Sequence, residues 1–299
     1  MILIPAIIAV AASMVNVFDG SRFLATALAD ASGEGARLSN DPAGFTVGTR
    51  MASDKSVASP PEAITVAPSI TSFSTRPKTQ FYIGGDSYSV HGAGQSHSLT
   101  NPDPQTLRFE IRPGDHAWFD SSRVDRSEVS GNYIPGGTPI GINYQFMVQA
   151  NDANNTFTNT ASWLVVGQMH DGGTVAGTSP PFAMQLEGNH VQLVARYVEP
   201  GGNPSNGSSD LHMLTLWTDP NPIVPGQYYD INIHANVSNT GGGLLKLSVN
   251  GEQVVNYSGP LGFGSQTYWE QGVYRNAGPA EAVSVDFRNL TLTTGPRPR

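Results

Sequence analysis

The stretch Gln168-Met-His170 combines an amide and an imidazole, and an imidazole can exchange a proton near neutral pH. It follows strand-forming residues, and side chains alternate along a strand. Val166, Gln168 and His170 are therefore expected on one face, with Val165 and Met169 on the other. Such polar groups need partners when buried. This face is therefore either in contact with a ligand or the solvated outer face of a sheet.

Two further stretches carry groups of the same kind. In residues 122–129, alternation places Arg126 and Glu128 on one face, with Arg123 at the start of the run. Alone, this pattern is typical of a solvated face. In residues 268–276, Trp269 and Val273 are expected to face a core. The side chains on the opposite face are Tyr268, Glu270, Gly272, Tyr274 and Asn276.

The rest of the sequence predicts the strands that must position these groups. The chain has 299 residues with 33 glycines, 22 prolines and only 13% charged residues, which favours short strands joined by turns. Asn250-Gly251, between two apolar runs, is a strong hairpin signal. We predict an antiparallel two-sheet sandwich over residues 76–299. The clearest expected strands are 106–112, 143–150, 162–170, 181–187, 190–197, 211–218, 228–235, 244–250, 252–257, 268–275 and 283–293.

Residues 1–75 differ in composition and are predicted to form an irregular arm outside the sandwich. Residues 1–12 are apolar but shorter than a membrane span needs. They fit the apolar part of a secretory signal, although the positive start is missing, or an anchoring or packing segment. Residues 18–31 have the pattern of a short helix, and residues 53–68 read as a linker.

Charge and residue usage exclude several function classes. The net charge of −8 argues against general nucleic-acid binding, which needs a basic surface. Only Lys55, Lys78 and Lys246 among the 16 basic residues are lysines. Because arginine grips a carboxylate or sulfate at two points, an anionic ligand would be met by a local arginine cluster.

No metal or cofactor site is expected from the spacing of the candidate ligands. The chain has no cysteine, so it has neither disulfides nor a thiolate metal site. His91, His97 and His116 lie in loop-like sequence without metal-ligand spacing. The oxygen-rich segments that begin at Asp152 and Asp219 fit either a structural calcium site or solvated turns, and turns are the more frequent outcome.

Read together, the polar stretches resemble the motifs of a known family. Residues 126–129, 168–170 and 268–275, in this order, are similar to those of jelly-roll polysaccharide lyases of the heparin lyase I and glucuronan lyase type. Alginate lyases are more distant relatives. Residues 226–235 and 243–252 add support, because they resemble the paired strands and Asn-Gly hairpin that precede the last motif. The resemblance implies an all-β, concanavalin-like jelly roll over roughly residues 76–293.

The resemblance also implies an activity and a set of catalytic residues. Such enzymes cleave polyuronates by β-elimination, which removes the proton from the carbon beside a carboxylate. Arg126 and Gln168 would neutralise that carboxylate. His170 would act as the base and Tyr274 as the acid, and Tyr274 could also act as a base if a nearby cation lowered its pKa. The implied substrate-binding residues are Arg123, Glu128, Tyr268, Glu270 and Asn276.

Two positions depart from the family pattern. Glu270 stands where the family usually has lysine, and Ser130 replaces a second arginine of the alginate lyases. A carboxylate beside an acidic glycan would repel it unless it is paired. We therefore expect an ion pair between Glu270 and Arg126, Arg123 or Arg275, with Arg275 the least suitable because it faces the other way. Glu128 is expected to be a structural partner of Arg126.

Three functional hypotheses follow. The first is a secreted, extracellular lyase that acts on a uronic-acid polysaccharide. The second is a glycan-binding protein on the same fold that has lost turnover, which Glu270 favours. The third is a structural or adhesion component of a virion or other particle, in which residues 1–75 contact an assembly partner.

Overall fold

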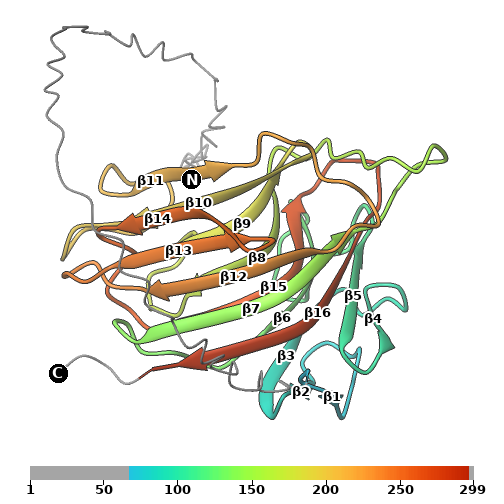
Figure 1. Cartoon of the computed structure of the whole chain (residues 1–299), viewed down its shortest axis with the longest axis horizontal. Coiled ribbons are helices and arrows are strands. Elements are labelled where there is room, and N and C mark those ends of the chain that lie inside the picture. Colours follow the sequence, from blue (N-terminus) through green and yellow to red (C-terminus); the bar gives the residue numbers. More distant parts are fainter. Residues whose placement is uncertain (1–66, 296–299) are drawn as a thin grey trace, which may run out of the picture. The chain divides into compact units, whose positions relative to one another are not determined.

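The computed structural model describes residues 67–295, and these residues form two antiparallel β-sheets (Figure 1). The expected all-β, two-sheet class is confirmed. No helix occurs between residues 67 and 295, so this part of the chain has none that could cross a membrane. The predicted short helix at residues 18–31 lies outside the described residues.

The nine-stranded sheet has the order β1-β2-β3-β6-β15-β8-β9-β10-β11. Its centre is β15, which lies between β6 and β8 although these three strands are far apart in the sequence. All three sequence motifs therefore meet at the middle of one sheet. The strands are β1 (Ile70–Thr71), β2 (Gln80–Ile83), β3 (Asp86–Gly92), β6 (Val124–Ser130), β8 (Leu164–Asp171), β9 (Phe182–Glu187), β10 (His190–Tyr197), β11 (His212–Thr218) and β15 (Thr267–Asn276).

The seven-stranded sheet has the order β14-β13-β12-β7-β16-β5-β4. Asn250 and Gly251 connect β13 and β14 with φ angles of 51° and 82°, the left-handed conformation that a tight hairpin of this kind requires. The predicted hairpin is therefore present. The strands are β4 (Leu99–Asp103), β5 (Thr106–Ile111), β7 (Pro139–Val148), β12 (Tyr229–Asn236), β13 (Leu244–Val249), β14 (Glu252–Ser258) and β16 (Val283–Thr294).

One apolar core joins the inner faces of the two sheets. Trp269 of β15 is fully buried, and its ring lies 5.9 Å from that of Tyr144 on β7. Val273 belongs to the same cluster, as its alternation with Tyr274 predicted. The inner face of β15 is thereby fixed on the core, and the alternate side chains must point to the outer face of the nine-stranded sheet.

The predicted boundary at residue 76 is later than the first strand. Ile70 and Thr71 pair with β2, and the ring of Phe73 lies 5.5 Å from that of Phe81. Ile70 and Thr71 therefore belong to the sheet, and Phe73 packs against it. The remainder of the predicted arm, residues 1–66, lies outside the described residues.

Candidate active site on the outer face of the nine-stranded sheet

Strand register brings the predicted catalytic residues onto one face. Tyr274 lies opposite Arg126 of β6, and Tyr268 lies opposite His170 of β8. Glu270, midway between the two tyrosines, lies opposite Gln168. All of these side chains point away from the core, and His170 is part-exposed rather than packed in the interior.

A β-bulge corrects one expectation about β8. The register shifts between Val165 and Gly167, and Val166 joins the core while Val165 lies on the outer face. Simple alternation placed these two valines the other way round. A bulge inserts one unpaired residue and so reverses the faces on one side of it. Gln168 and His170, which follow the bulge, keep the expected orientation.

A glycine permits close contact between β15 and β6. Gly272 has a φ of 147°, and a Cβ there would lie 2.2 Å from the carbonyl oxygen of Ser127 and 2.6 Å from Cα of Glu128. No other residue type fits this space. Gly272 lies within the second bulge of the site, between Gln271 and Tyr274. Glu128, beside this close contact, is buried.

Glu128 and Glu270 form a buried carboxyl pair bridged by one amide. Gln168 Nε2 donates to Glu128 Oε1 at 2.9 Å and to Glu270 Oε2 at 3.2 Å. Arg126 Nη1 lies 2.5 Å from Glu128 Oε2 and 3.9 Å from Glu270 Oε2. The predicted ion pair between Glu270 and Arg126 is therefore present, and Glu128 is the partner of Arg126 that we expected.

The loop between β5 and β6 encloses the Arg126 guanidinium. Asp120 accepts hydrogen bonds from Arg126 Nε at 2.9 Å and Nη2 at 3.2 Å. The guanidinium carbon lies 3.7 Å from the centre of the Tyr274 ring and 5.3 Å from that of Phe119. Arg126 is only 6% exposed as a result. Two of the residues that enclose Arg126, Asp120 and Phe119, lie outside the sequence motifs.

His91 is a site residue that the sequence analysis missed. It lies in strand β3 rather than in a loop, and its Nδ1 is 3.0 Å from Glu270 Oε1. The rings of Trp118 and Phe119 pack edge-on against it at 5.6 and 5.2 Å. The alternation of His91 with the core residue Val90 was a signal that His91 lies on the outer face of a strand. Its contact with Glu270 could not be predicted, because the two residues are distant in the sequence.

The two carboxyl groups of the pair titrate differently. Burial and the charge of Glu270 raise the pKa of Glu128 to about 8. Burial would also raise the pKa of Glu270, but the hydrogen bond to His91 and the charges of His170 and Arg126 hold it below its usual value. The buried pair as a whole therefore keeps a proton to a higher pH than two separate carboxyl groups would.

This proton makes stability depend on pH. Between about pH 4.5 and 8 the folded chain retains a proton on the Glu128–Glu270 pair that the unfolded chain has lost, so the free energy of unfolding falls as pH rises. The slope from this group is at most about 1.4 kcal/mol per pH unit. We expect Glu128→Gln to flatten the pH dependence in urea unfolding, whereas Glu252→Gln, at an exposed position, leaves it unchanged. An unchanged slope in Glu128→Gln would contradict the shared proton.

His170 is held in the tautomer that a base requires. Its Nδ1 lies 2.9 Å from the carbonyl oxygen of Asp171, which can only accept, so Nδ1 carries the proton of the neutral ring. Nε2 is then the basic nitrogen. The ring stacks on Tyr268 at 5.1 Å, and Tyr268 packs edge-on against the exposed Tyr133.

Tyr274 is suited to donate a proton. Burial raises the pKa of its phenol although the charge of Arg126 opposes the shift. The neighbouring cation therefore does not lower the pKa of Tyr274, which was the condition for it to act as a base. A phenol that keeps its proton at neutral pH can give it to a leaving oxygen.

Two of the predicted substrate-binding residues, Arg123 and Asn276, lie away from the carboxyl pair. Arg123 is exposed in the loop before β6, and its backbone oxygen accepts from Ala277 N. Asn276 Oδ1 accepts from Ser162 Oγ at 2.9 Å and from Trp163 N at 3.3 Å, so its side chain fixes the start of β8. Neither residue touches the carboxyl pair. Both positions are at or beyond strand ends, where alternation no longer defines direction.

The described residues contain no cluster of three or more histidine or acidic side chains arranged to hold a metal ion. Asp152 accepts hydrogen bonds from Asn154 N and Thr156 N, and Asp219 accepts from Asn221 N. Both carboxylates thus close their own turns. His97 pairs with Asp115, and His116 Nδ1 donates to the carbonyl oxygen of Gly114.

Comparison with known proteins identifies the family. A family model described as polysaccharide lyase matches residues 87–291, which is more than half of the chain. The chain therefore belongs to the polysaccharide lyase family, as the motifs indicated. A search of curated proteins found no sequence match.

Solved structures that resemble this chain include several lyases. An endo-β-1,4-glucuronan lyase from the fungus Trichoderma reesei is 14% identical, with a TM-score of 0.50, over 70% of this chain and 87% of that chain. A marine alginate lyase from Zobellia galactanivorans is 15% identical, with a TM-score of 0.44, over 77% of this chain and 95% of that chain. The glucuronan lyase match shows the shared fold.

Proposed function

We propose that this polysaccharide lyase cleaves an acidic, uronic-acid-containing glycan by β-elimination. The observation that carries the proposal is the placement of Arg126, Gln168, His170 and Tyr274 on one face of three adjacent strands. Glu270 lies between the two ends of this group, and its charge acts on both His170 and Tyr274.

The reaction needs one base and one acid. His170 Nε2 takes the proton from the carbon beside the sugar carboxylate, and the electron pair moves into that carboxylate. The bond to the neighbouring leaving oxygen then breaks, a carbon–carbon double bond forms, and Tyr274 protonates the leaving oxygen. The resemblance assigns stabilisation of the anionic intermediate to Arg126 and Gln168, although both already contact Glu128 here.

The test is incubation of the full chain with glucuronan, alginate and heparin, followed by ultraviolet absorbance of the unsaturated product. Absorbance should rise with at least one polymer and not with its carboxyl-reduced form, because the proton beside a reduced group is far less acidic. A rise that is equal on both forms, or absent on all polymers, would contradict the proposal.

A glycan-binding protein without turnover is the second candidate function. Arg126 is already engaged by Asp120 and Glu128, and Glu270 places a negative charge on the same face. Both features weaken recognition of a substrate carboxylate at this point. If the chain has this second function, it binds glycan without turnover.

The variant Glu270→Lys separates the two functions. In a lyase, wild type turns over and Glu270→Lys lowers kcat/KM at least tenfold, because an ammonium cannot accept from His91 or Gln168 and repels Arg126. In a binder, wild type gives no product and Glu270→Lys gains activity. Glu252→Lys, at an exposed position of β14, makes the same charge change and should have no effect.

We extend the proposal to an extracellular site of action, because acidic polysaccharides are encountered outside cells. The surface of a virion or other particle is the alternative location, with residues 1–75 as the contact to an assembly partner. Fractionation of the producing culture tests this point: the intact chain should be found in the medium or on particles. Retention inside the cells would contradict it.

A further inference from the structure

Arg196 of β10 lies on the same outer face as the candidate active site. Its neighbour Ala195 belongs to the core, so alternation turns Arg196 outward. Val194, two residues earlier, packs in a small outer-face cluster with Val165 and Tyr274. Arg196 is not part of any sequence motif discussed above.

Strand register aligns Arg196 with His170. Met169 of β8 and Ala195 of β10 both pair with Phe182 of β9, so the next position on each side, His170 and Arg196, flanks Pro181. The hydrogen bond from Arg196 N to Pro181 O, 2.7 Å, agrees with this register. Two strand spacings separate the Cα atoms of His170 and Arg196 by about 10 Å.

The guanidinium of Arg196 has spare hydrogen-bonding capacity. Within residues 67–295 its guanidinium donates one hydrogen bond, from Nη1 to the carbonyl oxygen of Pro180 at 3.1 Å, and no carboxylate of that range forms an ion pair with it. The enclosed Arg126 and Arg275, in contrast, each pair with an aspartate. Burial lowers the pKa of Arg196 to about 10, so it remains charged at neutral pH.

We propose that Arg196 binds the carboxylate of an acidic sugar unit lying alongside His170. A guanidinium can hold a carboxylate through two parallel hydrogen bonds, and four of its five N–H groups have no protein acceptor here. The inference rests on the proposed function and deepens it: Arg196 supplies the free cation that Arg126, closed off by Asp120 and Glu128, does not.

The separation suits one sugar unit. His170 and Arg196 lie on the same face on either side of Pro181, which adds no charge or hydrogen-bond donor of its own. On β11 the residue paired with Arg196 is Met213, which is 64% exposed and equally uncharged. No acidic side chain lies between His170 and Arg196 along this line of paired residues. A sugar carboxylate bound there would therefore be attracted by Arg196 without repulsion from a neighbouring carboxylate.

The test measures binding in a His170→Ala background, so that polymer is not consumed. Arg196→Met is compared with Arg112→Met, which makes the same charge change on the other sheet. The probes are glucuronan and alginate oligosaccharides and their carboxyl-reduced forms, with calorimetry for affinity and thermal unfolding for stability.

We expect Arg196→Met to weaken binding of the acidic oligosaccharide at least tenfold, about 1.4 kcal/mol, and to leave binding of the reduced form unchanged. Arg196→Lys should retain part of the affinity, and Arg112→Met should match the background. Equal losses on both probe forms, no loss, or no binding of any acidic probe would overturn the assignment. If Arg196→Met weakens binding of the acidic probe alone but the chain with His170 intact gives no product, only the proposed lyase function is overturned.

Discussion

Replacing His170 by alanine is expected to lower kcat by about 10²- to 10⁴-fold, the usual contribution of a positioned general base. The reason lies in its geometry: Asp171 O fixes the proton on Nδ1, and Nε2 remains free to accept. Because no hydrogen bond joins His170 to Glu128, Glu270 or Gln168, the carboxyl network should survive the change.

The control for this prediction is His116→Ala. His116 is exposed, and its Nδ1 likewise contacts a backbone carbonyl, that of Gly114. Initial rates followed by ultraviolet absorbance should be unchanged in the control and nearly lost in His170→Ala, while affinity for the oligosaccharide stays within about threefold. Full activity in His170→Ala would remove His170 from the mechanism.

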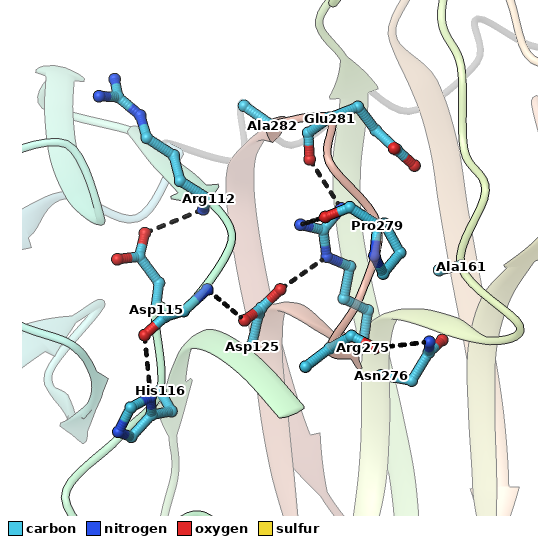
Figure 2. A network of polar contacts seen from close by, with 12 residues as sticks. Arg112, Asp115, His116, Asp125, Ala161, Arg275, Asn276, Pro279, Glu281 and Ala282 are labelled. Atoms are coloured by element: carbon cyan, nitrogen blue, oxygen red, sulfur yellow. Dashed lines mark hydrogen bonds and ion pairs between the residues drawn. The ribbon is translucent and has the colours of Figure 1, made fainter. Parts of the chain in front are cut away.

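Asp125→Ala is expected to destabilise the fold by about 3–5 kcal/mol, because it leaves a buried arginine without its counter-ion. Asp125 and Arg275 are both 0% exposed, and their side chains lie 3.1 Å apart (Figure 2). Arg275 also donates to Glu281 O at 2.9 Å, which fixes its position but leaves its charge uncompensated.

Urea unfolding measures this effect, and the double variant Asp125→Leu/Arg275→Met provides the internal check. Removing both charges should recover much of the lost stability, since the cost comes from the orphaned charge. Glu110→Ala breaks the exposed pair with Arg112 and should cost less than about 1 kcal/mol. A loss in Asp125→Ala as small as that in Glu110→Ala would contradict the account.

The buried pair of Asp125 and Arg275 also supports the loop that encloses Arg126. Asp125 Oδ1 accepts from Gly114 N (Figure 2), and Asp115 O accepts from Arg126 N, so the start of the β5–β6 loop is attached to β6. This loop carries Asp120, which encloses the Arg126 guanidinium. We therefore expect loosening at Asp125 to alter the site as well as the fold.

Most of the sandwich could be predicted from the sequence because its signals are local. Alternation located β10 at residues 190–197 without error, and Asn250-Gly251 placed the hairpin between β13 and β14. The order of strands was not predictable in this way. β15 lies between β6 and β8, a pairing set by packing of the two sheets and not by neighbouring residues.

The candidate site was predictable only where alternation held. Gln168, Glu270 and Tyr274 point as expected, whereas the bulge at Gly167 reversed Val165 and Val166. A bulge depends on how the partner strands pair, so one strand's pattern does not contain it.

The residues that complete the site come from segments with no motif. His91 lies on β3, Asp120 on a loop and Arg196 on β10, and their relation to Glu270, Arg126 and His170 exists only in the folded sheet. Arg123 and Asn276, which are near the motifs in sequence, bind no member of the carboxyl network, and their predicted substrate-binding roles stay predictions.

The most direct test of the central claim is the mass of the products released from a defined uronic-acid oligosaccharide. β-elimination divides the chain without adding water, and it leaves a double bond that absorbs ultraviolet light. We predict two products whose masses sum to that of the substrate, one of them unsaturated. Products whose masses sum to substrate plus one water, without ultraviolet absorbance, would show hydrolysis and contradict the account.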